Sequence, residues 1–394
     1  MLCSLGTALL DEFRWLDDDG LEAGRPREVR LGGGGVYGAC SSMPPLSCAR
    51  LTPGRAAAIG ARVWSRDVGL LVDRGPDFPS AVQRQLDSFG PIWHYRDVDT
   101  PTPRVRTARY RLKPSRATLT RLTTSCSQAL NLSRPPSSTR DFSYLTPPPE
   151  RSLDDLSTIT TLDKLSFLHL CCPPSSLAAL LPSLADLSGA PQLVYEPIPF
   201  ACTPAELPQL ADLLSHVRVF SPNHDEAAVL LGVPAPPSAA SGSHVEQLTR
   251  RFRKLGARDV VIRAGERGAF VLPDGALEGS WVPPFHSSAD KVKDTVGAGN
   301  AFLVRLCSHS LALCAACAGF EPSSDDGLER SQGGLMAGLA LSHDIERAAR
   351  YGAVSAGIVV ESIGLPVLTT SESEKEEELW NGRSARARLE DMDR

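Results

Sequence analysis

Apolar and polar positions form regular blocks from about residue 165 onward, and these blocks predict strands and helices in turn. Short, continuous apolar runs predict buried strands, and apolar residues at helical spacing predict amphipathic helices between them. The predicted strands are residues 165–170, 193–195, 217–220, 259–263 and 269–272, and the predicted helices are residues 177–187, 207–217, 243–255 and 345–360. Strands that alternate with helices predict a parallel sheet covered on both faces, which is an α/β fold.

Two of the predicted helices begin with a local signal. Residues 203–206 and 243–246 have the spacing of a capping box, in which a Thr or Ser is followed three positions later by a Glu. Gly256 follows the second of these helices, where a left-handed C-cap is expected.

The first 160 residues show a weaker pattern. Residues 2–10 are apolar and predict a first strand that ends at Asp11, on the sheet edge where open α/β sheets bind ligands. A turn-forming Asp before a loop is the alternative interpretation. Further short strands are predicted at residues 93–95, 104–110 and 141–144. The residues from 371 onward are highly charged and predict an exposed helix or a disordered tail.

Composition narrows the class of protein. The 394 residues suffice for one large α/β domain, and a net charge of −5 without a basic patch argues against direct binding of nucleic acid. The N-terminus lacks a basic region, and the apolar run at 306–320 is too short to span a bilayer, so we expect a soluble, cytoplasmic protein with no membrane partner. The ten cysteines show no secreted-type framework, and Cys314 and Cys317, which have metal-pair spacing, are best interpreted as ordinary thiols.

The most informative stretch is residues 294–302, Asp-Thr-Val-Gly-Ala-Gly-Asn-Ala-Phe. Gly297 and Gly299 flank Ala298 and allow the backbone to pass close to a ligand. A helix-like apolar run begins at Ala301, so successive N–H groups and the helix N-terminus make a seat for an anion. A phosphoryl group in transfer needs such a seat, because its transition state is stabilised mainly by positioning and electrostatics.

This nonamer resembles the C-terminal signature of the pfkB/ribokinase-like carbohydrate kinase family, Asp-Thr-x-Gly-Ala-Gly-Asp-x-Phe, and differs at one defined position. The family has its catalytic Asp where this chain has Asn300. The family's Asp takes the proton of the attacking hydroxyl, and a carboxamide cannot act as that base. The resemblance is closest to a fungal branch linked to maintenance of the killer virus, which combines Glu-Pro, Ser-Pro-Asn-His-x-Glu and Gly-x-Gly-Asn, so Asn300 also fits the pattern of that branch.

The resemblance implies a nucleotide site. Asn223 and Glu226 match the family's Asn-x-x-Glu element, which manages the magnesium and phosphate end of ATP, and Glu226 is expected to reach Mg²⁺ through water. Gly265 and Gly268 resemble the family's nucleotide loop. Arg263 stands where Thr is usual in that loop, and offers a cation instead of a hydroxyl.

The resemblance also implies residues on the two sides of the anion seat. Asp294 and Thr295 are expected on the nucleotide side. Asp11 is expected to contact substrate hydroxyls, and Gly33 and Gly34 to bring backbone against the sugar.

Three segments interrupt the family pattern, at residues 36–55, 110–128 and 304–332, and they hold six of the ten cysteines. Their ends are compatible with splice-site codons, such as GT at the start and the Gln codon CAG at the end, which favours retained introns. Natural surface insertions, which folds tolerate readily, are the alternative.

These observations predict a ribokinase-like, three-layer α/β/α sandwich with a Rossmann-like central sheet and a small β lid. Residues 1–367 would form one domain and residues 368–394 a charged tail. The expected function is phosphoryl transfer from MgATP to a hydroxyl of a sugar or nucleoside, weakened by Asn300. The alternative is an inactive pseudokinase that binds nucleotide or sugar as a scaffold or sensor. The sequence does not predict the oligomeric state or a protein partner.

Overall fold

The computed structural model describes residues 2–4, 9–16, 28–32, 59–110, 142–146, 152–160, 164–187, 189–233, 242–293, 334–362, 365–370 and 377–394. Three predictions therefore lie outside the described residues: the nonamer 294–302, the glycines Gly33 and Gly34, and the interrupting segments apart from Tyr110.

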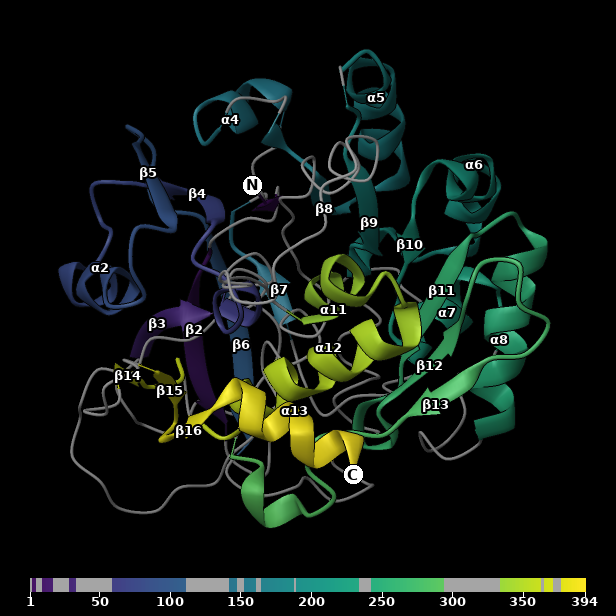
Figure 1. Ribbon diagram of the computed structural model, residues 1–394. Coiled ribbons are helices and arrows are strands. Elements are labelled where there is room, and N and C mark those ends of the chain that lie inside the picture. Colours follow the sequence, from purple (N-terminus) through teal and green to yellow (C-terminus); the bar gives the residue numbers. More distant parts are fainter. Residues whose placement is uncertain are drawn as a thin grey trace, which may run out of the picture.

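A nine-stranded sheet forms the centre of the fold, with the strand order β13-β12-β11-β10-β9-β8-β1-β4-β5 (Figure 1). The strands are β1 Leu2–Ser4, β4 Val68–Arg74, β5 Trp93–Asp97, β8 Phe167–Cys172, β9 Gln192–Pro197, β10 Val219–Phe220, β11 Asp259–Arg263, β12 Ala269–Leu272 and β13 Ser280–Val282. All neighbours pair in parallel except β11 with β12 and β12 with β13. These two antiparallel pairs are joined by short turns instead of helices, so the expectation of a parallel sheet holds for the other strands.

Successive residues of each central strand point into two different cores, which gives the fold its three layers. On β11, Val261 packs in one buried cluster, whereas Val260 and Ile262 pack in the other. The first cluster includes buried residues of α2 Ser80–Asp87, α11 Gly334–Ser342, α12 Ile345–Val360 and α13 Ala385–Asp393. The second cluster includes buried residues of α4 Leu153–Ser157, α5 Pro174–Ala185, α6 Leu207–Leu213, α7 His224–Leu230 and α8 Gly242–Lys254. The predicted α/β/α architecture is confirmed.

A second sheet of four strands has the order β3-β2-β6-β7 and consists of β2 Leu9–Leu16, β3 Glu28–Gly32, β6 Arg104–Tyr110 and β7 Phe142–Tyr144. It corrects the prediction for the N-terminus. The first strand, β1, ends at Ser4, and Asp11 lies inside β2, level with Arg30 and Val105. An apolar run does not distinguish one strand from two strands that belong to different sheets, so the prediction that Asp11 ends the first strand was wrong.

Local capping signals were only partly right. The N–H of Glu206 donates to the carbonyl of Thr203 and closes a 3-10 turn, η3 Pro204–Glu206, so the Thr203 side chain makes no cap. The helix α8 begins at Gly242, which makes Ser243 its second residue. The left-handed C-cap at Gly256 is confirmed by its φ of +98°.

The prediction of an exposed helix or a disordered tail from residue 371 onward was only partly right, because the helix α13 forms but the segment also packs on the core. A three-stranded sheet forms from β14 Leu368–Thr370, β15 Glu378–Trp380 and β16 Arg383–Ser384, and α13 follows it. The side chain of Trp380 is fully buried and stacks on Phe89, with ring centroids 5.9 Å apart. The charges of this segment act as ion-pair partners, because Glu378 forms a bidentate pair with buried Arg62 at 2.6 Å. The predicted domain boundary at residue 367 stays a prediction.

Candidate active site

Four neighbouring parallel strands, β8 to β11, end on the same edge of the central sheet, and ionisable side chains from three of them meet there. Glu196 is the second-last residue of β9, and Arg263 is the last residue of β11. His169 of β8 lies 3.4 Å from Glu196, between Nε2 and Oε2. Open α/β sheets bind ligands at this edge, so the cluster is a candidate functional site on position alone.

The turn after β10 adds a fourth ionisable side chain, that of Glu226, which a capping box with Asn223 holds in place. The Asn223 side chain accepts the Glu226 N–H at 2.9 Å, and Glu226 Oε2 accepts the Asn223 N–H at 2.8 Å. This reciprocal pair satisfies two donors at the start of α7 and fixes the Glu226 backbone and carboxylate together. The sequence-predicted Asn-x-x-Glu element is therefore a helix start at the carboxyl edge.

Arg263 ties the cluster together. Its backbone N–H donates to the carbonyl of Pro222 at 3.1 Å, and Arg263 forms an isolated parallel bridge with Asn223, three positions beyond the last β10–β11 pair. Its Nη2 group donates to Glu196 Oε1 at 2.6 Å and to the Ser221 carbonyl at 3.1 Å, and lies 3.6 Å from Glu226 Oε2. One guanidinium nitrogen thus contacts three oxygen atoms, two of them through hydrogen bonds and the third as an ion pair.

The cluster is buried, and burial makes its charges interdependent. Glu196 is 5% exposed, and Arg263 and Glu226 are each 9% exposed. Burial raises the pKa of Glu226 to about 7, in spite of the opposing charge of Arg263. Burial also acts on Glu196, but the nearby charge of Arg263 and the contact with His169 outweigh it and lower the pKa of that carboxyl. Glu196 is therefore the ionised partner of Arg263.

Two polar groups of the cluster are left without a protein partner. Glu226 Oε1 has no hydrogen bond or ion pair to the described residues, and the Nε–H of Arg263 is buried without an acceptor there. Buried polar groups are normally satisfied, so the buried Nε–H of Arg263, at the ligand edge of the sheet, is a donor that a ligand could use. No group of three or more His, Cys, Asp or Glu side chains able to hold a metal ion occurs in the described part of the chain. One open carboxylate oxygen fits contact with a hydrated Mg²⁺ through water, and does not fit a full set of direct ligands.

The glycine turn follows Arg263 directly. Gly265 to Arg267 form a 3-10 turn, and the Ala264 N–H donates to the Gly268 carbonyl at 2.7 Å, which closes the β11–β12 connection. Gly268 has a φ of +86°, and a Cβ atom there would lie 2.0 Å from the Val282 carbonyl oxygen. Gly265 has a φ of +58°, and a Cβ atom there would meet nothing within 4 Å. Gly268 is thus needed for packing, and Gly265 leaves open space beside Arg263.

The structure brings together five of the predicted residues, namely Asn223, Glu226, Arg263, Gly265 and Gly268. It places the Asp11 backbone in the four-stranded sheet. The predicted residues Asp294, Thr295, Gly297, Ala298, Gly299 and Asn300 lie outside the described residues, as do Gly33 and Gly34. The sequence analysis did not identify Glu196 as a site residue. The signal for it was present, because Glu196, like Arg263, is a charged residue at the end of a buried strand.

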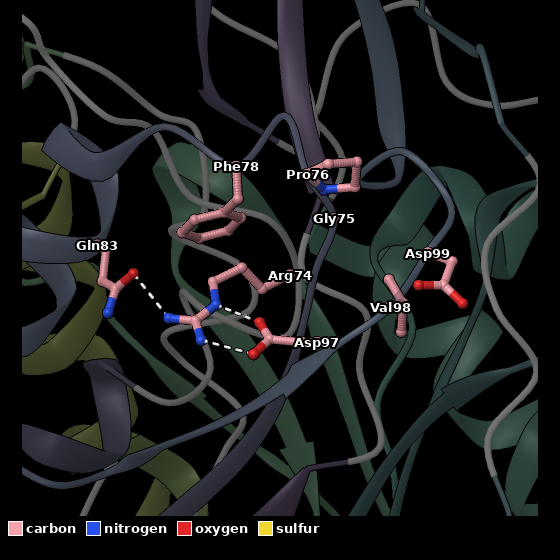
Figure 2. Close-up of a pocket in the computed structure, with 8 residues that line it drawn as sticks. All are labelled: Arg74, Gly75, Pro76, Phe78, Gln83, Asp97, Val98 and Asp99. Atoms are coloured by element: carbon pink, nitrogen blue, oxygen red, sulfur yellow. Dashed lines mark hydrogen bonds and ion pairs between the residues drawn. The ribbon is translucent and has the colours of Figure 1, made fainter.

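A separate hollow of about 430 Å³ lies at the carboxyl ends of β4 and β5 (Figure 2). Arg74 forms a bidentate pair with Asp97 at 2.6 and 2.9 Å, and also donates to Gln83 at 2.9 Å. The β4 strand lies five strand spacings from β11, about 24 Å along the sheet. The polar groups that Figure 2 shows in contact satisfy one another, so this hollow is a weaker candidate than the Arg263 cluster.

Comparisons with known proteins agree with this fold. A model of the pfkB family of carbohydrate kinases matches residues 151–311. An uncharacterized protein of Schizosaccharomyces pombe is 27% identical over 365 residues, which cover 86% of this chain and 84% of that protein. Protein MAK32 of Saccharomyces cerevisiae is 24% identical over 326 residues, which cover 77% of this chain and 74% of that protein.

Among solved structures, an Arabidopsis thaliana ribokinase complexed with ribose and ATP aligns with a TM-score of 0.53 and 14% identity, over 99% of this chain and 98% of that one. The chain is thus similar to pfkB/ribokinase-like carbohydrate kinases over residues 151–311, and its relatives include the fungal branch that its sequence resembles. No helix in the described ranges is both long and apolar enough to cross a membrane.

Proposed function

We propose that the protein binds MgATP at the carboxyl ends of β8 to β11 and transfers its terminal phosphoryl group slowly to a hydroxyl of a sugar or nucleoside. The observation that carries the proposal is the buried cluster of Glu196, Arg263 and Glu226, which leaves one oxygen and one N–H donor open beside the glycine turn. The match to the pfkB family of carbohydrate kinases supports a kinase, and the bound ATP of the Arabidopsis ribokinase supports ATP as the donor.

Each residue has a role that follows from its chemistry. Mg²⁺, when bound, would neutralise charge on the phosphates, and Glu226 Oε1 would hold one of its waters. Arg263 would place a fixed positive charge next to the phosphates, and Gly265 would let the backbone approach them. Gly297, Ala298 and Gly299, with Asp294 and Thr295, would complete the anion seat. Asp11, Gly33 and Gly34 would contact the hydroxyl substrate.

Asn300 sets the expected rate. An amide has no accessible pKa with which to accept the proton of the attacking hydroxyl, so transfer would lack its general base. Loss of a general base lowers rates by about 10² to 10⁴-fold, while electrostatic stabilisation of the phosphoryl group is unaffected. The same residue favours the second candidate function, a pseudokinase that binds nucleotide or sugar and acts as a scaffold or sensor.

The test is consumption of MgATP over a panel of sugars and nucleosides by the full chain and by its Asn300→Asp variant. Turnover by the unchanged protein, increased in the variant, is the result we expect. Silence in the unchanged protein with turnover in the variant would identify the pseudokinase. Silence in both, together with no binding of MgATP in calorimetry, would contradict both functions.

A further inference from the structure

The ion pair between Glu196 and Arg263 is an expensive arrangement for stability alone. Both groups are at least nine-tenths buried, and buried ion pairs contribute little net stability because each charge loses its hydration. The pair also leaves the Arg263 Nε–H buried without an acceptor in the described residues. Buried atoms without a hydrogen-bond partner also occur at the amino ends of these strands, on Asp259 Oδ2 and Arg253 Nε, so the position of the Glu196–Arg263 pair at the ligand edge is what points to a role in binding.

The geometry shows what the pair does to its neighbour. Glu226 Oε2 already accepts the Asn223 N–H at 2.8 Å, and Arg263 Nη2 lies 3.6 Å from the same oxygen. One hydrogen bond and one ion-pair contact on the same oxygen favour one rotation of the carboxylate, so the other oxygen, Oε1, is the one that remains for a ligand. Arg263 can hold this position because Glu196 Oε1 anchors its Nη2 group at 2.6 Å and His169 lies against the far oxygen of Glu196.

We propose that Glu196 is a positioning residue, which anchors Arg263 so that Arg263 and the Asn223 N–H together turn Glu226 Oε1 toward the bound nucleotide and its hydrated cation. The inference rests on the proposed nucleotide site, and adds to it a residue that touches no ligand. Glu196 acts through Arg263, and Arg263 acts on both the carboxylate and the phosphates. Neither residue is required to transfer a proton.

A matched ion pair exists on the opposite edge of the same strands. Arg218 Nη1 lies 2.8 Å from Asp259 Oδ2, where Arg218 precedes β10 and Asp259 begins β11. The carboxylate of this pair, Asp259, is 1% exposed, and is therefore buried as Glu196 is. It lies at the amino ends of the strands, away from the ligand edge, and serves as the control for effects that come from folding alone.

The experiment uses the full chain, with three variants at each edge. These are Glu196→Gln, Arg263→Met and the double variant, and Arg218→Met, Asp259→Asn and the double variant. Thermal unfolding reports stability, and calorimetric titration with MgATP reports affinity. Each single variant leaves one buried charge unpaired, and each double variant removes both charges, so both double variants should regain thermal stability relative to the less stable single variant.

The two edges should differ in affinity. All three variants at the carboxyl edge should bind MgATP about 10- to 100-fold more weakly, the usual effect of losing a partner that orients a site residue. The Glu196→Gln/Arg263→Met double variant should still bind MgATP weakly, although its thermal stability is regained. The three variants at the amino edge should bind like the unchanged protein.

Three outcomes would overturn the inference in distinguishable ways. If the unchanged protein binds MgATP and the stable Glu196→Gln/Arg263→Met variant binds it equally well, the pair is structural and the nucleotide site stands without it. If the unchanged protein binds no MgATP, the proposed function fails, and the inference that rests on it fails too. Weakening of the amino-edge variants to the same degree would also overturn it, because the loss would then follow stability.

Discussion

The two edges of β10 and β11 carry clusters of acidic and basic side chains that differ in burial and in charge balance. At the carboxyl edge, one guanidinium, Arg263, faces two carboxylates, and all three side chains are at most 11% exposed. At the amino edge, Asp259 accepts the Asp274 N–H at 2.8 Å and pairs with Arg218. Asp274 in turn pairs with Arg253 and Arg258.

The comparison shows how a functional cluster differs from a structural one. The amino edge has three guanidinium groups for two carboxylates, and they are 22, 22 and 48% exposed, so water helps to solvate them. The carboxyl edge has an excess of carboxylate, is shielded from water, and leaves Glu226 Oε1 open within the described residues. A hydrated cation bound at the ligand edge would balance this excess negative charge.

The two edges should differ most in the loss of stability when the arginine of each ion pair, Arg263 or Arg218, is replaced. Arg263→Met leaves Glu196 buried without its cation, and we expect a loss of about 3–5 kcal/mol in the free energy of unfolding. Arg218→Met should cost only about 1–2 kcal/mol, because Asp259 keeps the Asp274 N–H and its pKa is already raised by burial, so it takes up a proton easily. Urea unfolding measures both values, and an equal or larger loss in Arg218→Met would contradict the comparison.

The pH dependence of stability should follow Glu226. Its pKa of about 7 in the folded protein lies above the ordinary value of 4.5, so its favourable contribution is complete below pH 4.5 and is lost as the pH rises through 7. The shift corresponds to about 3 kcal/mol. Glu226→Gln should therefore gain stability relative to the unchanged protein between pH 5 and pH 8, as measured by urea unfolding in metal-free buffer. A constant difference across that range would show that Glu226 does not titrate there.

The glycine turns at the two edges should also differ. Gly268→Ala places a Cβ atom 2.0 Å from the Val282 carbonyl oxygen at a φ of +86°, whereas Gly275→Ala, near the amino edge, meets nothing within 4 Å at a φ of +73°. We expect losses of about 3 kcal/mol and about 1 kcal/mol, because only the first adds a clash to the left-handed conformation. Thermal unfolding would test this order, and equal losses would mean that the β11–β12 turn relaxes freely.

The smallest effect is expected in the hollow of Figure 2. Asp97→Asn removes one partner of the Arg74 pair about five strands from β11. Because distant sites act independently, MgATP affinity should change by less than about twofold. A larger loss in calorimetric titration would extend the nucleotide site to this end of the sheet.

The sequence predicted elements well where burial alone determines them. The strands β11 and β12 and the helix α12 have the predicted bounds, because continuous apolar runs and helical spacing reflect the core directly. Glu196 was not predicted as a site residue, because its partner Arg263 lies 67 positions away and the two meet only through strand order.

Local signals failed where a distant partner competed. Glu246 was expected to cap α8 but accepts the Trp281 Nε1–H at 3.0 Å, from a strand 35 positions later. The C-terminal charged residues were expected to face water. Glu378 instead pairs with Arg62, 316 positions earlier, and Trp380 in the same strand is fully buried. Capping and charge patterns describe a chain segment in isolation, and they fail when tertiary contacts use the same groups.

The most direct measurement of the central claim is a crystal structure of the full chain with ATP and Mg²⁺. We expect the phosphates at the carboxyl ends of β8 to β11, within hydrogen-bond reach of Arg263, with Glu226 Oε1 bound to a water of the magnesium ion. Nucleotide in the hollow beside Arg74 and Asp97, or phosphates out of reach of both Arg263 and Glu226, would contradict the account.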